Sequence, residues 1–317
     1  CPLFGRNGTQ VTLHKMEQKN QDDLHYDPVK KNGVTINGMT FPPRQPCGVP
    51  WKEHIENLRS LELRSTDVFI CAYPKAGTHW LWEVTHMLLT GKVEYETRTK
   101  ENLMMEFITK ETIDNLDSPR ILNTHLPFCM LPVKEMKEKG VKVLNVYRNP
   151  KDTVVSMYFH FRQVFPHLKD YSLLDFLRIF LQDDMVYGNY FCFIKQMEAF
   201  IQENPDVPVF QLSYEAMRKE NQVQHVQRLA KFLEVEASED LCERITEACS
   251  FQKMKQADQS KTLPSEISSH TMTKDTKMYR KGEVGDWKNY LTVAMNEMMD
   301  GAIQEKLSGS SYKLQYT

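Results

Sequence analysis

The sequence predicts an α/β fold, a single domain with a central parallel sheet flanked by helices. Short apolar runs of strand length alternate along the chain with stretches that have the periodicity of helices. This alternation is typical of βαβ units, which place parallel strands in one sheet. The loop between the first run and its helix contains Lys, Gly and Thr, a composition typical of a P-loop-like anion cradle.

The composition fits one large globular domain. The chain has 317 residues, of which 41% are hydrophobic and 26% are charged. Residues 1–49 are polar and end in a proline-rich stretch, so we expect an N-terminal extension there and the folded domain over residues 50–317, with its core beginning near Trp51.

The charge balance and the cysteines limit the partners and the compartment. Forty Lys and Arg residues against 42 Asp and Glu residues give a net charge of −2, which excludes a global field that recruits nucleic acid or an acidic membrane. No apolar run is long enough to span a membrane, and seven scattered cysteines form neither a zinc pattern nor a disulfide framework. We therefore expect a cytoplasmic protein with reduced thiols.

The first strand and helix are predicted on either side of the anion-binding loop. Residues 68–73 are apolar or aromatic and indicate a buried strand. Residues 80–89 indicate a helix, because apolar residues such as Trp80 and Leu88 recur at helical spacing, and Gly91 can cap its end.

Three further strands complete the predicted sheet. The predicted elements are a strand at 121–124 that ends at His125, a strand at 141–147 before a helix at 151–163, and a strand at 207–212 before a helix at 222–233. Ligands bind outside the carboxyl ends of parallel strands, so we expect a site at these loops. Residues 255–277 lack apolar periodicity and indicate a surface loop, either a lid or a solvated connection.

Three segments have residues suited to phosphate. Loop 73–80, Tyr-Pro-Lys-Ala-Gly-Thr-His-Trp, differs from a Walker A motif because its Lys precedes the Gly, and a βα turn with an incidental Lys is the alternative interpretation. Loop 147–152, Tyr-Arg-Asn-Pro-Lys-Asp, places an Arg at a helix start, with Ser156 one turn inside. Segment 280–289, Arg-Lys-Gly-Glu-Val-Gly-Asp-Trp-Lys-Asn, places two cations before a Gly.

Together these segments resemble the cytosolic sulfotransferase family over about residues 50–300. The matching signatures are Tyr-Pro-Lys-x-Gly-Thr-x-Trp, Arg-Asn-Pro-Lys-Asp-x-x-Val-Ser and Arg-Lys-Gly-x-x-Gly-Asp-Trp-Lys-Asn, in the family's order. The resemblance implies transfer of a sulfuryl group from 3′-phosphoadenosine 5′-phosphosulfate (PAPS) to a hydroxyl or amine, with 3′-phosphoadenosine 5′-phosphate (PAP) as product and no metal. It implies a small-molecule acceptor, a phenol, alcohol, steroid or amine, which the sequence does not identify.

The resemblance also implies a role for each matching position. The P-loop-like loop would hold the phosphosulfate through Lys75, Ala76, Gly77, Thr78 and His79. The 3′-phosphate would be held by Arg148, Ser156, Arg280, Lys281 and Gly282. The adenine would be held by Trp80 and Phe251, with Tyr214, Cys249 and Met254 nearby.

His125 lies in Asn-Thr-His-Leu-Pro, which is similar to the family's Lys-Thr-His-Leu-Pro. In the family this His is the catalytic base. A lone His at a strand end is more often structural, but a hydroxyl acceptor must lose its proton and an imidazole titrates in a suitable range. The implied mechanism is in-line displacement, in which His125 removes the proton, Lys75 stabilises the departing phosphate oxygen and Ser156 holds Lys75 away until the acceptor arrives.

Four positions depart from the family pattern. Ala76 and His79 stand where the family has Ser and Thr, and Cys249 replaces a Thr or Ser near the adenine. Asn123 replaces a Lys two residues before His125, which removes a cation that would face the sulfuryl group. We expect lower turnover from this loss. If the missing cation limits turnover, Asn123→Lys should raise kcat. The rival hypothesis is that a protonated His79 supplies the missing positive charge.

Two alternatives stand beside the active sulfotransferase. One is a nucleotide-binding protein of the same fold with weak or lost transferase activity. The other is a nucleotide kinase, against which the missing Walker A Lys-Ser/Thr argues. Residues 288–297 match the Lys-x-x-x-Thr-Val-x-x-x-Glu pattern through which many of these enzymes form two-fold dimers, which predicts a homodimer around Val293.

Overall fold

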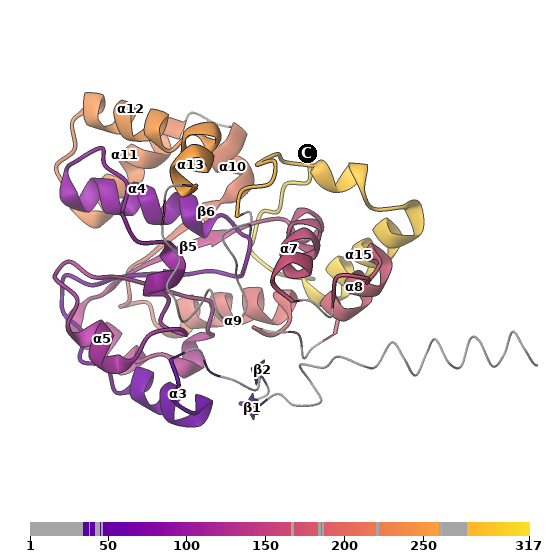
Figure 1. Cartoon of the computed structure of the whole chain (residues 1–317), viewed down its shortest axis with the longest axis horizontal. Coiled ribbons are helices and arrows are strands. Elements are labelled where there is room, and N and C mark those ends of the chain that lie inside the picture. The colour runs from indigo at the N-terminus through magenta and orange to yellow at the C-terminus, as the bar shows by residue number, and fades with distance from the viewer. Residues whose placement is uncertain are drawn as a thin grey trace, which may run out of the picture.

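The central sheet of the computed structural model has four parallel strands in the order β4-β3-β5-β6 (Figure 1). The structure describes residues 34–37, 39–41, 45, 47–165, 168–182, 185, 187–219, 222–259, 261 and 278–317. The strands are β3 (Val68–Cys71), β4 (Ile121–Thr124), β5 (Lys142–Tyr147) and β6 (Val209–Ser213). The predicted α/β class with a parallel sheet flanked by helices is confirmed.

The helices surround this sheet (Figure 1). They are α3 (Trp51–Arg59), α4 (Thr78–Thr90), α5 (Lys110–Asp114), α6 (Val133–Lys139), α7 (Pro150–Val164), α8 (Leu173–Phe180), α9 (Tyr190–Glu203), α10 (Tyr214–Lys219), α11 (Gln222–Leu233), α12 (Glu239–Ala248), α13 (Phe251–Asp258) and α15 (Val293–Lys306). Short 3₁₀ turns are η1 (Lys100–Leu103), η2 (Phe128–Met130) and η4 (Asp286–Asn289). No helix among the described residues is both long enough and apolar enough to cross a membrane.

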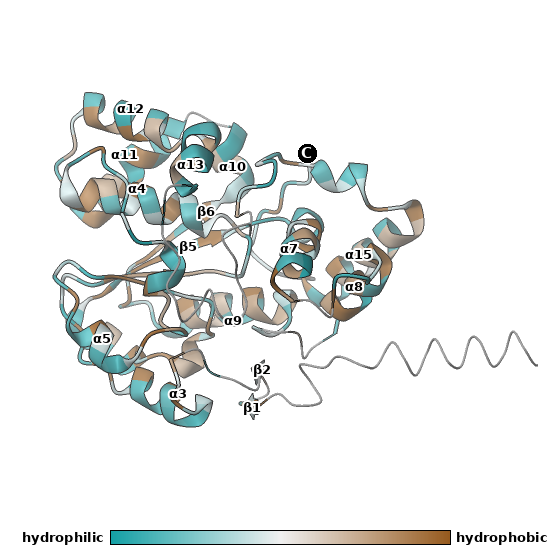
Figure 2. Cartoon of the chain, in the orientation of Figure 1, coloured by the Kyte–Doolittle hydropathy of each residue, from teal (hydrophilic) through white to brown (hydrophobic). Residues whose placement is uncertain are grey.

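The sheet divides the core in two. Successive residues of a strand point to opposite faces, so Val68 and Ile70 of β3 pack with α4, α11 and α12, while Phe69 and Cys71 pack with α7, α8 and α9. Figure 2 shows teal and brown alternating around the helices, as expected for elements with one face on the core.

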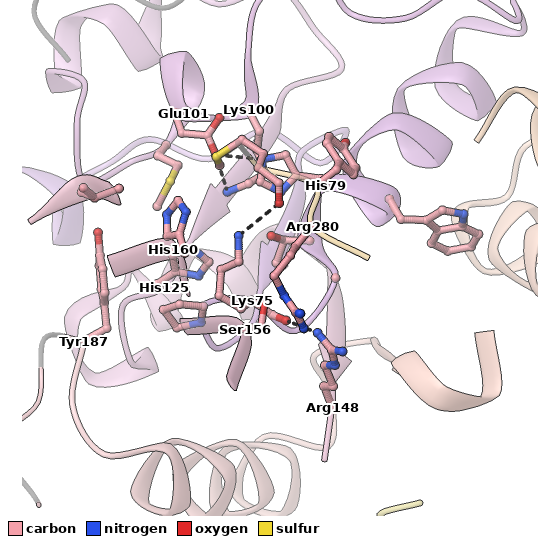
Figure 3. Close-up of a pocket in the computed structure, with 18 of the residues that line it drawn as sticks. Lys75, His79, Lys100, Glu101, His125, Arg148, Ser156, His160, Tyr187 and Arg280 are labelled. Carbon is pink, nitrogen blue, oxygen red and sulfur yellow. Dashed lines mark hydrogen bonds and ion pairs between the residues drawn. The ribbon is translucent and has the colours of Figure 1, made fainter. Parts of the chain in front are cut away.

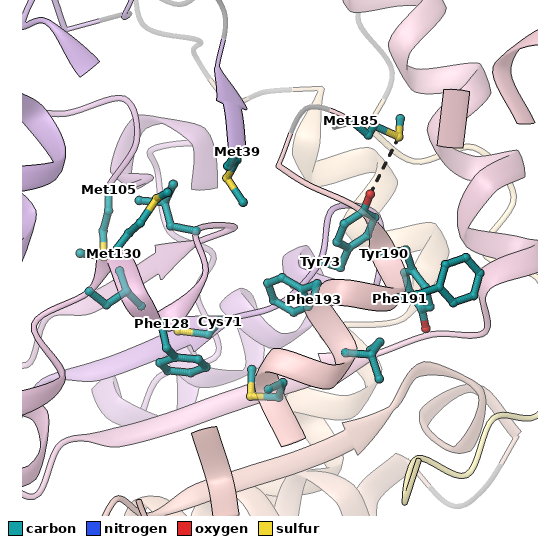
Figure 4. Close-up of a cluster of buried hydrophobic side chains, with 14 of the residues drawn as sticks. Met39, Cys71, Tyr73, Met105, Phe128, Met130, Met185, Tyr190, Phe191 and Phe193 are labelled. Carbon is teal, nitrogen blue, oxygen red and sulfur yellow. Dashed lines mark hydrogen bonds between the residues drawn. The ribbon is translucent and has the colours of Figure 1, made fainter. Parts of the chain in front are cut away.

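Aromatic packing behind the first loop positions two loops of the site (Figure 4). Tyr73 packs edge-on against Tyr190 and Phe193, with ring centroids 5.2 and 5.7 Å apart, and donates a hydrogen bond to the Gly188 carbonyl. The Tyr190 hydroxyl donates to the carbonyl of Arg148. The loops after β3 and β5 therefore share one rigid support on α9.

A buried ion pair fixes the starts of β3 and β4. Arg120 Nε donates to Asp67 Oδ1 over 2.8 Å, and Arg120 Nη2 donates to the Glu62 carbonyl over 2.9 Å. Asp67 and Arg120 are 0% and 2% exposed. Asp67 immediately precedes β3 and Arg120 immediately precedes β4, so the ion pair favours the observed register between the two strands. In that register Thr124, at the end of β4, lies beside Cys71 at the end of β3, and His125 follows directly.

Part of the predicted extension packs on the domain. Strands β1 (Val34–Ile36) and β2 (Met39–Phe41) form an antiparallel hairpin, and Phe41 stacks on Trp51 with centroids 4.5 Å apart. Met39 and Phe41 belong to a core cluster, and the boundary at residue 49 stays a prediction. Of the predicted loop at 255–277, residues 255–258 belong to α13 and residues 262–277 lie outside the described residues.

Candidate active site

A cavity of about 580 Å³ lies where the loops after β3, β4 and β5 meet. Its volume suits a small-molecule ligand. It brings together all but one of the predicted site residues: Lys75, Gly77, Thr78, His79, Trp80, His125, Arg148, Ser156, Tyr214, Cys249, Phe251, Met254, Arg280, Lys281 and Gly282. The exception is Ala76, which is fully buried and whose amide donates to the Tyr73 carbonyl over 3.3 Å.

The loop before α4 requires glycine at position 77. Gly77 has a φ of 113° and is the N-cap of α4. A Cβ there would lie 2.7 Å from Cδ2 of Tyr214. The backbone therefore runs close to the Tyr214 ring at a helix N-terminus, an arrangement that favours a bound anion.

Two arginines in the cavity have unused donors. The Nε atoms of Arg148 and Arg280 are buried and have no hydrogen-bond partner among the described residues. Arg148 also lies over the Tyr214 ring, 4.3 Å from its centroid, which holds the guanidinium in place. Buried donors without partners cost free energy, so both positions fit an anionic ligand that would accept from them.

Gly282 adds a second close approach of backbone to ring. Its φ is 71°, and a Cβ there would lie 2.3 Å from Cδ2 of Phe251. Arg280 and Lys281 both bind Asp286, with Lys281 Nζ 2.8 Å from Oδ1. The segment thus presents two cations and a bare glycine beside an aromatic wall.

Asp152 ties this segment to α7. Its carboxylate accepts hydrogen bonds from the amides of Gly285 over 2.8 Å and Trp287 over 3.0 Å. The carboxylate is 1% exposed and stands in the first turn of α7, directly after the loop of Arg148. Arg148 and Arg280 are therefore parts of one hydrogen-bonded unit.

The cavity has a large excess of positive charge. Its described lining holds the cations Lys75, Lys100, Arg148, Arg218, Arg280 and Lys281, and Glu101 is its one carboxylate. Lys100 and Arg148 are 2% and 6% exposed. Ion pairs with Glu101, Asp152 and Asp286 offset only part of this charge, so the cavity fits a ligand with several negative charges.

His125 is neutral and oriented to accept a proton. Its Nδ1 lies 2.6 Å from the carbonyl oxygen of Ala72, which can only accept, so Nδ1 has the hydrogen and Nε2 has the free lone pair. Burial, with the Lys100 charge second, lowers the pKa of His125 to about 3. Its amide donates to Glu106, and its ring packs edge-on to Tyr187.

Lys75 lies near His125 in the cavity (Figure 3). Its Nζ donates to the carbonyl of Met278 over 3.4 Å. Within the described residues it makes no hydrogen bond to Ser156, which lines the same cavity. Burial lowers the pKa of Lys75 to about 8.

The lowered pKa of Lys75 gives a test of its contact with an anion. A bound polyanion favours the protonated amine, so PAP binding should take up close to one proton above pH 8 and affinity should fall as pH rises through that range. Titration calorimetry at pH 8.5 in buffers of different ionisation enthalpy measures this uptake. Lys75→Met should remove most of it, and equal uptake by both proteins would contradict the contact.

Sequence reasoning missed several polar cavity residues, among them Lys100, Glu101, His160 and Arg218. Glu101 Oε1 lies 3.0 Å from His79 Nε2. Burial favours the neutral acid, but His79 and Lys100 together hold the pKa of Glu101 well below its usual range. Ser156 and His160 share one face of α7 at i, i+4 spacing, which is a signal the sequence contained. No sequence pattern indicated that Lys100 and Glu101 of η1 would line the cavity.

The cavity also has apolar walls. Its aromatic and aliphatic lining residues include Phe41, Trp51, Met104, Phe107, Phe161, Val164, Phe165 and Tyr187. Such walls suit the apolar body of an organic molecule.

Comparisons with known proteins identify the family of this chain. A family model described as "Sulfotransferase domain" matches residues 65–311. Sulfotransferase 1E1 of Bos taurus is 35% identical over 285 residues, which cover 84% of this chain and 93% of that protein. Sulfotransferase 1B1 of Canis lupus familiaris is 33% identical over 301 residues, which cover 90% and 96%.

A solved structure supports the same relationship. Mouse sulfotransferase SULT7A1, crystallised in complex with PAP, is 28% identical to this chain and superposes with a TM-score of 0.68. The match covers 88% of this chain and 96% of that one. The family model matches well over half of the chain, and the curated relatives match nearly their whole length. This chain therefore belongs to the cytosolic sulfotransferase family and is a PAPS-dependent sulfotransferase.

Proposed function

We propose that this enzyme transfers the sulfuryl group of PAPS to a hydroxyl or amine of an apolar small molecule, with His125 as the base. The excess of positive charge in the cavity, beside a neutral histidine, is the observation that supports this proposal most directly. PAPS supplies an activated sulfuryl group with a phosphate leaving group. Lys75, Gly77, Thr78 and His79 would hold its phosphosulfate, and Arg148, Ser156, Arg280, Lys281 and Gly282 its 3′-phosphate.

The proposed roles divide the reaction between two side chains. As the acceptor oxygen or nitrogen bonds to sulfur and the bond from sulfur to the phosphate oxygen breaks, His125 Nε2 takes the acceptor's proton. Lys75 would stabilise the charge on the departing phosphate oxygen. The adenine would lie among Trp80, Phe251 and their neighbours. The proposal requires no metal ion.

An assay with PAPS and a panel of phenols, alcohols, steroids and amines tests the proposed function. We expect transfer to acceptors with an apolar body, because the acceptor end of the cavity is aromatic and aliphatic. ATP with Mg²⁺ is the control donor. PAP binding without transfer to any acceptor would favour the alternative, a nucleotide-binding protein with lost activity.

We also infer a cytoplasmic location and a two-fold dimer. Within the described residues the cysteines are all free thiols, which suits a reducing compartment: Cys47, Cys71, Cys129, Cys192, Cys242 and Cys249.

The proposed dimer is supported by Val293, which is 77% exposed at the start of α15. An exposed apolar side chain at the centre of the segment 288–297 can pack on its own copy across a two-fold axis.

Val293→Glu should convert the dimer to a monomer, because it places like charges together at the axis. Sedimentation at micromolar concentration measures the change. Glu305→Lys, farther along α15 and also exposed, is the matched control and should leave the dimer intact. A wild-type monomer, or a Val293→Glu dimer of unchanged affinity, would contradict the inference.

A further inference from the structure

Lys100 occupies an unusual place for a lysine. It lies in η1, is 2% exposed and lines the same cavity as His125 and Lys75. Its Nζ donates to Oδ1 of Asn123 over 3.0 Å and lies 3.8 Å from Oε1 of Glu101. Burying the charged ammonium group of a lysine costs desolvation free energy. Hydrogen bonds and ion pairs from the protein and from a ligand can together offset this cost.

Asn123 holds this lysine in position. Its Oδ1 accepts from Lys100 Nζ, and its Nδ2 donates to the carbonyl oxygens of Lys100 over 3.2 Å and Leu103 over 3.0 Å. A carboxamide can accept and donate at once, whereas a lysine could only donate. Asn123 therefore attaches η1 to β4, two residues before His125.

The charge of Lys100 acts on the centre of the site. It contributes to lowering the pKa of His125, Lys75 and His160, after the larger effect of burial in each case. Figure 3 shows Lys75, Lys100, His125 and His160 gathered around one part of the cavity. Glu101 offsets part of this charge but also pairs with His79.

We propose that Lys100 is a catalytic residue whose ammonium group contacts the sulfuryl oxygens of PAPS, in place of the lysine absent from position 123. The proposal rests on the sulfuryl transfer that the family relationship shows for this chain. The positive charge comes from η1 rather than from β4, and Asn123 is its positioning residue. The imidazole of His79 already faces the Glu101 carboxylate at 3.0 Å, whereas the nearest partner of the Lys100 ammonium is the neutral amide of Asn123.

The chemistry requires a cation at this point. Negative charge on the sulfuryl oxygens redistributes as one bond to sulfur forms and another breaks, and a fixed ammonium stabilises that charge without reorganising. A hydrogen bond from a charged donor is about twice as strong as a neutral one. Burial lowers the pKa of Lys100, while the nearby carboxylates of Glu101 and Glu106 oppose this shift, and negative sulfuryl oxygens would likewise favour its protonated form.

A binding experiment tests this without turnover. PAPS has the sulfuryl group and PAP lacks it, so Lys100→Met should weaken PAPS binding about tenfold and PAP binding by much less. Titration calorimetry without acceptor measures both. Lys100→Arg retains the charge and should retain the preference for PAPS. Lys110→Met, on the surface of α5 outside the cavity, is the matched control and should change neither affinity.

The outcomes separate this proposal from the proposed function. Equal weakening of PAPS and PAP in Lys100→Met, with a melting temperature like that of wild type, would overturn the role of Lys100. If Lys100→Met is too unstable to measure, loss of the PAPS preference in Lys100→Arg would overturn it instead. A wild type that transfers nothing would refute the function but leave the binding result to decide the role of Lys100.

Substitution of Asn123 gives an independent result. Asn123→Lys should lower kcat, because it brings a second ammonium against Lys100 and removes the acceptor that holds it. This is the reverse of the sequence-based expectation. A rise in kcat in Asn123→Lys would show that position 123 lacks a needed cation and would contradict the proposal.

Discussion

His125→Gln is expected to lower kcat by about 10²–10⁴-fold, the usual cost of losing a general base. Glutamine approximates the size and polarity of the ring but cannot take up the acceptor's proton. PAP affinity should change little, because the cations that we propose bind its phosphates stay in place. Steady-state kinetics with PAPS and the best acceptor of the panel, together with PAP titration, measure both effects.

One control variant and one further measurement support this result. His86→Gln, on α4 outside the described cavity lining, should leave kcat unchanged. The further measurement is the pH dependence of kcat/KM of the wild type. His125 acts unprotonated and its pKa is about 3, so it should add no loss of rate as pH falls from 8 to 5. Wild-type kcat in His125→Gln would remove the histidine from the mechanism.

Arg120→Met should lower the free energy of unfolding by about 3–5 kcal/mol, because it leaves the Asp67 carboxylate buried without its partner. Urea denaturation should show a lower midpoint with an unchanged slope. Arg244→Met is the matched control, since Arg244 pairs with Asp240 at i, i+4 spacing on the exposed face of α12, and it should have little effect. Similar losses from both variants would contradict the buried pair's role.

Local signals in the sequence predicted most of the sheet and its helices. The strand at 121–124 and the helix at 222–233 have the predicted limits. In the helix, apolar residues recur at helical spacing. The strand predicted at 207–212 runs instead from Val209 to Ser213, which fits the exclusion of Pro208 from a strand interior. The helix predicted from residue 80 begins at Thr78, directly after the left-handed Gly77.

The site residues that lie in contiguous sequence motifs could be predicted from the sequence. The loops around Lys75 and Arg148, which follow β3 and β5, meet in one cavity as expected from the carboxyl ends of parallel strands, and the segment of Arg280 joins them there. Lys100 was not predictable, because it reaches the cavity through a tertiary contact with Asn123 that no periodicity encodes. The roles of all these residues stay predictions until the variants are measured.

Asp152 joins two parts of the candidate nucleotide site that lie far apart in the sequence and are therefore synthesised at different times. Its partners Gly285 and Trp287 follow it by 133 and 135 residues. During synthesis, β3 to β6 are all present once Ser213 has emerged, long before Arg280 can be held in place. A ligand stabilises only the state that binds it. We therefore expect the nascent sheet to fold on its own apolar core, and PAPS held by Arg148 and Arg280 together to stabilise the protein only after Trp287 has emerged.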